Sequence, residues 1–373
     1  MPNSQSGNLP TVPAGLHWQA RFYARTAPIW RWLSRLESGV LREEIERVAI
    51  TRPIYIAGVP RAGSTLLTEF LSTHPAVTSH RYSDFPNVYT PYWRNWLAER
   101  TRTNPSEAVE RAHGDRIMVT NESPEAVEEV IWMQFFASLH DPGVNQVLDK
   151  DTKAPDFERF YTDHVRKLLL ARGRERYLAK GNYNASRLQY LLKLFPDARI
   201  VVPVRSPANQ IASLIKQDRL FTRAAEQDPR IGPQLRMSGH FEFGPARCAV
   251  NTGCADEASR MVDCWQRGDL AAGWAIYWNS IYAHLLRQLE EDSALNDAVQ
   301  LVRYETLCQH PDATLRELLD HTGLDPQAAK AVTADFSERI SEPDYYRPDF
   351  SDEEMQQIDD ATHSTARALG YRT

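Results

Sequence analysis

Short apolar runs alternate with amphipathic stretches along most of the chain. The run at 53–59 (PIYIAGV) stops at a Gly/Pro turn, and Leu and Phe then recur at helical spacing over 64–73. The same order returns at 198–204 (ARIVVPV) and 298–304 (AVQLVRY), and 176–181 (RYLAKG) reads as one more short strand. Strands that alternate with helices predict an α/β fold with a mainly parallel central sheet and helices on both faces.

The same periodicity predicts helices outside these units. They are Pro124–Leu139, Pro155–Ala171, Ser186–Phe195, Gly273–Glu291 and Ser351–Leu369, the last opened by a capping box of Ser351 and Glu354. Residues 220–268 break into Gly, Pro and polar positions, so we expect a long inserted loop there that acts as a lid or substrate loop. The chain then divides into a tail with amphipathic helices (1–50), an α/β domain (51–325) and a C-terminal helical segment packed on the core (326–373).

The N-terminal region 18–50 contains one or two of these amphipathic helices. Its sequence WQARFYARTAPIWRWL mixes aromatic and basic residues, a composition that suits a membrane surface or a lipid substrate. A helix packed on its own domain is the simpler interpretation. We expect that packing and keep a peripheral membrane contact as the alternative.

Composition and charge exclude several classes of protein. The chain is 42% hydrophobic and 25% charged, as in ordinary globular proteins. Its 43 Lys and Arg against 49 Asp and Glu give a net charge of −6, so general affinity for nucleic acid is not expected and any anion site must be local. Four cysteines in 373 residues do not suggest a disulfide framework. With no apolar run long enough for a bilayer and no secretory signal, we expect a cytoplasmic protein.

The segment GVPRAGST (58–65) lies where a strand passes into a helix. Its spacing is G-x-x-x-x-G-S-T, against G-x-x-x-x-G-K-[ST] in a P-loop, so the P-loop Lys is missing. Successive backbone N–H groups and the positive end of the helix dipole still predict an anion site. Arg61 supplies a cation inside the loop, and this arrangement suits one phosphate-like group better than a triphosphate.

A second anion site is predicted after the strand at 198–204. Arg205 follows this strand directly, and Ser213 lies about two helical turns further on. Both side chains can therefore face a cleft at the carboxyl edge of the sheet. A guanidinium and a hydroxyl aimed together suit a second, separate phosphate.

Together the two loops resemble those of the sulfotransferases that use 3′-phosphoadenosine 5′-phosphosulfate (PAPS). The segments GVPRAGSTLL (58–67) and LSTHP (71–75) are similar to the family's 5′-phosphosulfate loop, and FPDARIVVPVRSPANQIAS (195–213) is similar to its 3′-phosphate motif. LVRYETLCQHPDATL (301–315) resembles a segment near the end of the family's core. The Arg in the 5′ loop is closer to the bacterial and tyrosylprotein branches than to the cytosolic branch, which has Lys there.

The resemblance implies a P-loop-type α/β fold, PAPS as the sulfonate donor and no required metal. It assigns the 5′-phosphosulfate to Pro60, Arg61, Ala62, Gly63, Ser64, Thr65 and Leu66, and the 3′-phosphate to Arg205 and Ser213. Arg61 is expected to bridge toward the transferring sulfonate. Lys180 and Tyr304 match later positions of the family's site, although Gly181 and Asn182 depart from the usual pattern and Tyr304 also fits a buried aromatic at a strand end. Cys248, Cys254 and Cys264 with His240 lack a C-x-x-C pair, so no metal site is predicted.

A hydroxyl acceptor also needs a general base. If the strand order follows the family, the segment SHRYSDFPNVYTPYW (79–93) starts on the sheet next to the 5′ loop. It offers Asp84 and His80, with Asp84 placed first by the resemblance to the tyrosylprotein branch. The acidic segment TNESPEAVEEVIW (120–132) is typical of a solvated helix start, with Glu122 or Glu125 able to order the acceptor.

The sequence thus predicts a sulfotransferase that moves the sulfonate of PAPS to a hydroxyl or amine of a small-molecule, lipid, glycolipid or carbohydrate acceptor. The alternatives are a P-loop kinase with a displaced cation and a non-catalytic nucleotide-binding protein. Neither the acceptor nor the oligomeric state follows from the sequence.

Overall fold

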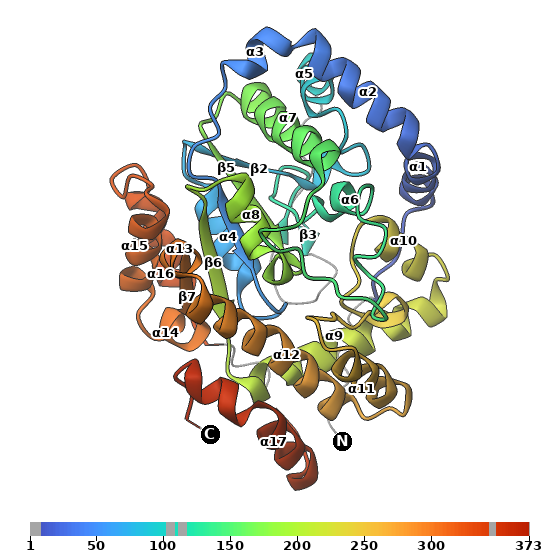
Figure 1. Ribbon diagram of the computed structural model, residues 1–373, viewed down its shortest axis with the longest axis vertical. Helices are drawn as coiled ribbons and strands as arrows, with labels where there is room; N and C mark the ends of the chain where they lie inside the picture. Colours follow the sequence, from blue (N-terminus) through green and yellow to red (C-terminus); the bar gives the residue numbers. More distant parts are fainter. Residues whose placement is uncertain (1–8, 102–108, 111–117, 343–347, 373) are drawn as a thin grey trace.

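Five parallel strands form the central sheet, in the order β2-β5-β1-β6-β7 (Figure 1). The computed structural model describes residues 9–101, 109–110, 118–342 and 348–372, so the first eight residues of the predicted tail lie outside it. The strands are β1 Ile54–Ala57, β2 Val77–Ser79, β5 Arg176–Gly181, β6 Arg199–Val204 and β7 Val299–Arg303, and a separate antiparallel pair is β3 Val109–Glu110 with β4 Met118–Val119.

Helices surround the sheet. They are α1 Ala14–Arg25, α2 Ala27–Val40, α3 Arg42–Glu46, α4 Ser64–Ser72, α5 Pro91–Thr101, α6 Glu129–Trp132, α7 Pro155–Arg172, α8 Leu188–Leu194, α9 Pro207–Gln227, α10 Ile231–Met237, α11 Ala255–Gln266, α12 Leu270–Glu291, α13 Ser293–Ala298, α14 Tyr304–Gln309, α15 Pro311–Thr322, α16 Lys330–Arg339 and α17 Asp352–Ala368. Short 3₁₀ helices are Tyr82–Asp84, Asn184–Ser186 and Gly244–Ala246. None of the helices in the described ranges is long and apolar enough to cross a membrane.

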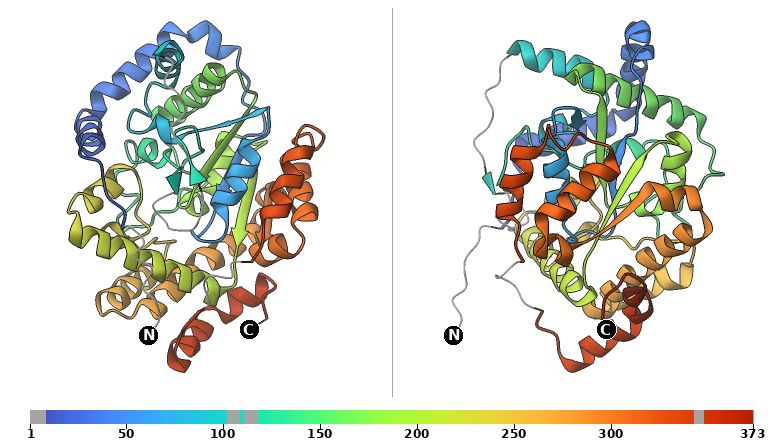
Figure 2. Two further views of the ribbon diagram at one scale, coloured as in Figure 1. Left: turned by 180° about the vertical axis from the view of Figure 1, so that it is seen from behind. Right: turned by 90° about the vertical axis from the view of Figure 1, so that its left-hand side faces the viewer.

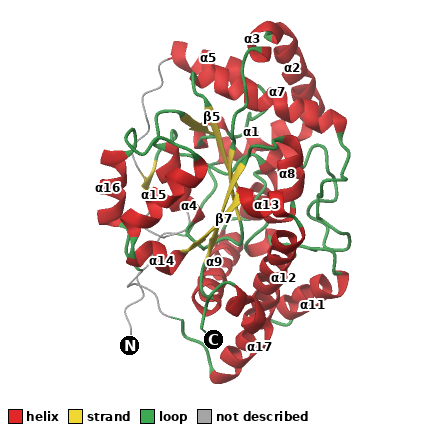
Figure 3. Ribbon diagram, turned by 60° about the vertical axis from the view of Figure 1, so that its left-hand side comes forward, coloured by secondary structure: helices red, strands yellow, loops and turns green. Residues whose placement is uncertain are grey.

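The sheet separates two apolar cores, because successive strand residues point to opposite faces. Ile54 and Ile56 of β1 pack with residues of α4, α15 and α16 on one face. Tyr55 and Ala57 pack with residues of α7, α8 and α12 on the other (Figure 3). This arrangement confirms the predicted α/β fold with a parallel sheet flanked by helices.

Much of the 220–268 segment is helical rather than a loop. Helix α9 continues to Gln227 because Phe221 and Ala224 lie on its buried side, and α11 buries Met261 and Trp265. The longest irregular stretch is 238–254, interrupted by the 3₁₀ helix Gly244–Ala246, and several of the glycines and prolines of this segment lie there. Because these residues are typical of loops, the sequence predicts a longer loop than the structure has.

The C-terminal helix α17 begins as predicted. Ser351 and Glu354 form the reciprocal capping box, with bonds of 3.2 Å and 2.9 Å. The helix packs on α12 and lies at the end of the molecule away from α3 (Figure 2).

Asp84, a predicted catalytic residue, lies in a buried ion-pair network. Its carboxylate contacts Arg94 of α5 and Arg172 of α7, and it accepts a 2.8 Å hydrogen bond from the backbone N–H of Arg81. His80 Nδ1 lies 3.4 Å from the same carboxylate. Burial alone would raise the pKa of Asp84, but the hydrogen bond with His80 and the charges of Arg172 and Arg94 outweigh it and hold the pKa well below its ordinary value. The network ties the chain after β2 to α5 and α7.

Replacing Asp84 by Asn removes the anion from two guanidinium groups, so we expect the free energy of unfolding at neutral pH to fall by about 3 kcal/mol. Because the folded-state pKa is depressed, the contribution of Asp84 is present above the ordinary carboxyl pKa of about 3.9 and is lost as the pH falls below it. Urea unfolding should show a difference between wild type and Asp84→Asn that narrows near pH ~3.

The matched control is Asp312→Asn, which breaks an exposed ion pair with Arg316. This variant should unfold almost like wild type, since exposed pairs contribute little. Equal stability of Asp84→Asn and wild type at neutral pH would contradict the role given to the network.

Candidate functional site

The predicted site residues follow the carboxyl ends of the strands. Arg61 comes after β1, Arg205 after β6 and Tyr304 after β7, while Lys180 lies at the end of β5. His80 follows β2, which β5 separates from β1. Since the strands are parallel, their carboxyl ends share one edge of the sheet, the usual place for a ligand in this class of fold.

The loop between β1 and α4 has the backbone of an anion-binding turn. Arg61 and Gly63 both have positive φ, at 72° and 95°. A Cβ at position 63 would lie 2.8 Å from the ring of Tyr304, so only glycine fits there without a shift. Gly63 is also the N-cap of α4, and without a side chain it cannot accept a hydrogen bond from the first N–H groups of the helix. An anion can accept those bonds instead.

The residues of the two predicted anion sites are in contact. Arg61 Nε donates a 3.1 Å hydrogen bond to Ser213 Oγ, and Arg205 Nη1 lies 3.5 Å from the Arg61 carbonyl oxygen. The Arg205 guanidinium stacks over Tyr304 at 4.8 Å from the ring centre. The structure therefore brings the loop at 58–65 and the start of α9 together. The Arg61 side chain is directed to Ser213. A bridge from Arg61 toward the sulfonate stays a prediction of the resemblance.

Lys180 completes the same edge of the sheet. Its Nζ donates a 3.0 Å hydrogen bond to Thr65 Oγ1 in the first turn of α4. The ammonium group thus lies beside the N-terminus of α4, and Arg61 occupies the loop before that helix. Three cationic side chains from three strand ends gather around one loop.

Sequence reasoning missed Gln210, which holds the loop in place. Its Nε2 donates to the carbonyl oxygens of Val59 and Pro60 at 3.0 Å and 2.9 Å, and its Oε1 accepts from Trp278 Nε1 at 2.9 Å. The side chain is fully buried. In the sequence, the only indication of this role is the position of Gln210 one helical turn before Ser213, in the predicted helix that ends the second motif.

The acidic segment at 120–132 is not the solvated helix start that the sequence suggested. Only Glu129–Trp132 is helical there. Glu129 forms a buried pair with Arg187 at 2.8 Å, and Glu128 accepts hydrogen bonds from Trp132 Nε1 and the Tyr177 hydroxyl, each 2.9 Å long. These carboxylates point inward to specific partners, which a count of charges along the chain does not show.

Glu125 lies half-buried near Lys180. Its Oε1 accepts a 2.7 Å hydrogen bond from the Ala126 N–H. Burial alone would raise the pKa of Glu125, but the charges of Lys180 and His240 outweigh it and lower the pKa to about 2. The carboxylate is therefore ionised at neutral pH and faces the cationic edge of the sheet.

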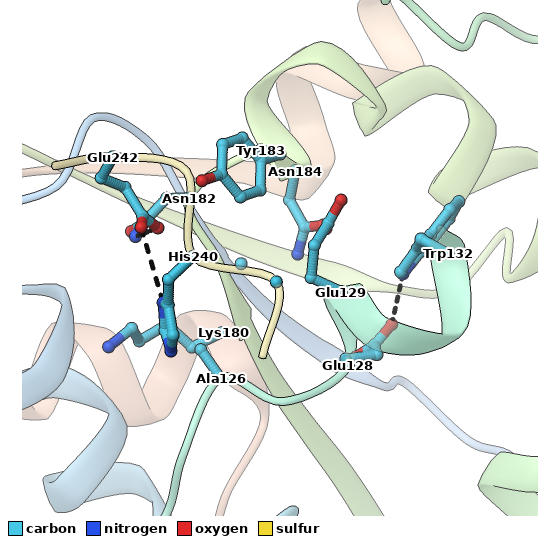
Figure 4. A pocket seen from close by; sticks show the side chains of 12 residues that line it. Ala126, Glu128, Glu129, Trp132, Lys180, Asn182, Tyr183, Asn184, His240 and Glu242 are labelled. Atoms are coloured by element: carbon cyan, nitrogen blue, oxygen red, sulfur yellow. Dashed lines mark hydrogen bonds and ion pairs between the residues drawn. The ribbon is translucent and has the colours of Figure 1, made fainter. Parts of the chain in front are cut away.

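His240 lines a small pocket together with Lys180 (Figure 4). Its Nδ1 lies 3.5 Å from the carboxylate of Glu242, which also accepts a 2.6 Å hydrogen bond from the Asn182 amide. Burial alone would lower the pKa of His240, but the hydrogen bond with Glu242 and the charges of Glu242 and Glu125 raise it. In the described ranges no three His, Cys, Asp or Glu side chains gather in a way that could bind a metal ion.

The two predicted bases lie in a different environment. His80 is 3% exposed, and its Nε2 lies 3.0 Å from Nε2 of His164. Asp84 is 4% exposed and is held by the arginine network. The polar atoms of both side chains are directed at protein partners, so this geometry favours a structural role for them.

The sequence of the chain matches the model of a known protein family. A model described as "Sulfotransferase family" matches residues 53–238, which include the loop after β1, Lys180, Arg205 and Ser213. No curated protein sequence matches the chain.

The fold is shared with a solved structure. Sulfotransferase STF9 from Mycobacterium avium has a TM-score of 0.54 and 13% identity, with 90% of this chain and 82% of that chain covered. Sulfotransferase STF1 from Mycobacterium tuberculosis H37Rv has a TM-score of 0.47 and 17% identity, with coverage of 91% and 85%. The family match, on a fold that places its motifs at one sheet edge, shows that the chain belongs to the sulfotransferase family and is an enzyme of sulfonyl transfer.

Proposed function

We propose that the sulfonate donor is PAPS and that it binds along the carboxyl edge of the sheet, between the loop at 58–65 and the start of α9. The observation that carries this proposal is the direct contact of the two loops, through Arg61 with Ser213 and Arg205 with the Arg61 carbonyl. One loop suits the 5′ end of the nucleotide and the other its 3′-phosphate. A nucleotide with phosphate groups on both sides of one ribose needs two such sites close together.

The residues at the 5′ end fit a phosphosulfate. The first turn of α4 presents N–H groups to an anion, and Lys180 Nζ lies 3.0 Å from Thr65 at the same place. PAPS, when bound, supplies the sulfonate and leaves as a bisphosphate. The ammonium of Lys180 and the helix start then offset the negative charge that grows on the leaving phosphate.

The residues at the 3′ end fit a second phosphate. Arg205 Nε is buried and has no hydrogen-bond partner among the described residues. Its guanidinium is held against Tyr304, so the plane of its donors is fixed before a ligand binds. Buried donors without partners are rare and costly, and a phosphate oxygen can satisfy this one.

We assign the proton acceptor to Glu125 in preference to Asp84 and His80. Glu125 is half-buried and faces Lys180, whereas the other two groups are held in the arginine and histidine contacts described above. A carboxylate with a low pKa is a weak base. In a loose transition state, however, the acceptor hydroxyl loses its proton late, when the new S–O bond has made that proton strongly acidic, so a weak base is sufficient.

The acceptor is a small molecule with a hydroxyl or amine group. Incubation of the full chain with radiolabelled PAPS and pools of phenols, amphiphilic alcohols and carbohydrates tests the transfer itself. Label on any acceptor supports the proposal. Transfer from labelled ATP instead, with none from PAPS, would favour the kinase alternative.

Arg205→Ala should weaken binding of the product nucleotide 3′-phosphoadenosine 5′-phosphate (PAP) by about 10- to 100-fold, because hydrogen bonds to charged groups contribute about 1.5–3 kcal/mol. Isothermal titration measures this change. Arg205→Lys should restore part of the affinity through its charge. Arg219→Ala, on the exposed side of α9, is the control and should bind like wild type. Unchanged PAP binding in Arg205→Ala would contradict the assignment.

Glu125→Gln should lower kcat by about 10²- to 10⁴-fold, the range of general-base help, and leave PAP affinity nearly unchanged. Initial rates with the acceptor found for the wild type give kcat, and titration gives the affinity. Glu122→Gln is the control, because Glu122 is exposed and pairs with Arg81. A normal kcat in Glu125→Gln, or an equal loss in Glu122→Gln, would remove Glu125 from the mechanism.

A further inference from the structure

Helix α2 buries a mixed side, in which Trp30 packs on the core, and turns an apolar stripe outward. Its buried residues are Ala27, Ser34, Glu37 and Ser38. Ile29, Trp32, Leu36 and Val40 are between 44% and 64% exposed. Their spacings of three and four residues place them in one stripe of the helix surface. A surface helix ordinarily has the opposite arrangement, with the apolar stripe against the core.

A buried ion pair fixes this orientation. Lys167 Nζ of α7 lies 2.9 Å from the Glu37 carboxylate and donates hydrogen bonds to the backbone oxygen and hydroxyl of Ser34. Glu37 also accepts a 2.7 Å hydrogen bond from the Trp93 N–H. Turning the apolar stripe inward would leave two buried charges without partners, which is strongly unfavourable. The exposure of the stripe is therefore set by the packing.

Helix α1 adds a second exposed apolar pair. Trp18 and Phe22 lie one turn apart and are 64% and 56% exposed. The corner to α2 is held by Thr26, whose hydroxyl accepts a 3.0 Å hydrogen bond from Trp30 Nε1. Helices α1 to α3 run along the outer edge of the molecule, with α7 on their inner side (Figure 1). We call Trp18, Phe22, Ile29, Trp32, Leu36 and Val40 together the N-terminal apolar face.

Arginines are the exposed charged residues of α1 and α2, the helices that form this face. From Leu9 to Leu41 the sequence contains four arginines and a single acidic residue, Glu37, which is buried against Lys167. Arg25 and Arg35 are exposed. The exposed glutamates of α3 begin only beyond Val40. In a chain with a net charge of −6, this region is a local basic surface.

We propose that the N-terminal apolar face binds the surface of an anionic lipid bilayer. Trp, Phe and Leu on a helix flanked by Arg are suited to the boundary between headgroups and acyl chains, where the apolar side chains insert and the guanidinium groups contact phosphate. A second copy of the chain fits less well. A two-fold interface places the same surface of both copies together, so it would bring the arginines of one copy against those of the other.

Binding of the full chain to vesicles tests the proposal. The probes are vesicles of phosphatidylcholine alone and of phosphatidylcholine with phosphatidylglycerol, and co-sedimentation measures the partition coefficient. We expect binding to the anionic vesicles that weakens as salt is added. Trp32→Ser with Leu36→Ser should lower the partition coefficient by about tenfold or more, because two exposed apolar side chains no longer insert. Arg25→Gln with Arg35→Gln should lower it by about tenfold, on anionic vesicles only.

The matched control is Trp96→Ser with Leu97→Ser, an apolar pair on α5 that is 46% and 55% exposed and lies outside the face. It should bind vesicles like wild type, and thermal unfolding should show that all variants are folded. Three results would overturn the proposal. The first is no binding of wild type to anionic vesicles, and the second is an equal loss of binding in the α5 control. The third is a wild-type protein that sediments as a dimer while the Trp32→Ser/Leu36→Ser variant sediments as a monomer. The last result would make the face an interface between two copies.

Discussion

The site depends on holding three like charges close together at one edge of the sheet. Arg61, Lys180 and Arg205 come from three strand ends and surround the start of α4, so they repel one another when no anion is present. Neutral groups orient these cations: Ser213 Oγ for Arg61, Thr65 Oγ1 for Lys180 and the ring of Tyr304 for Arg205. The ionised Glu125 near Lys180 offsets part of the repulsion. An anionic ligand therefore meets donors that are already oriented.

The backbone that carries these charges follows from the order of the strands. Parallel strands must return by crossovers, so every strand ends at the same edge, and β1 lies between β5 and β6. That order puts the loop after β1 between Lys180 and Arg205. Gln210 then joins α9 to this loop through two backbone carbonyls. The loop is thus held by its connection to β1, by the hydrogen bonds of Gln210 and by the close approach of Tyr304 to Gly63.

Four of the five strands of the central sheet and most of the long helices could be predicted, because apolar runs and helical spacing are local patterns. Cations at or after the ends of the predicted strands also indicated that Arg61, Lys180 and Arg205 lie at one edge of the sheet. Long-range pairing could not be predicted. Glu129 forms an ion pair with Arg187, and Glu37 forms one with Lys167, which is some 130 positions away in the sequence. Acidic residues that the sequence suggests are solvated are therefore buried. For the same reason the periodicity of α2 predicts an amphipathic helix but not which side faces the core. Asp84 was a reasonable base by position, and its three-way ion network is equally invisible in the sequence.

We propose that two anion sites on one edge of the sheet hold the 5′ and 3′ phosphate groups of one nucleotide. A crystal structure of the chain with PAP would show where each phosphate binds. We expect the 5′-phosphate on the N–H groups at the start of α4 and beside Lys180, with the 3′-phosphate on Arg205 and Ser213. A nucleotide bound elsewhere, or one whose 3′-phosphate points to solvent while Arg205 Nε stays unpaired, would contradict it.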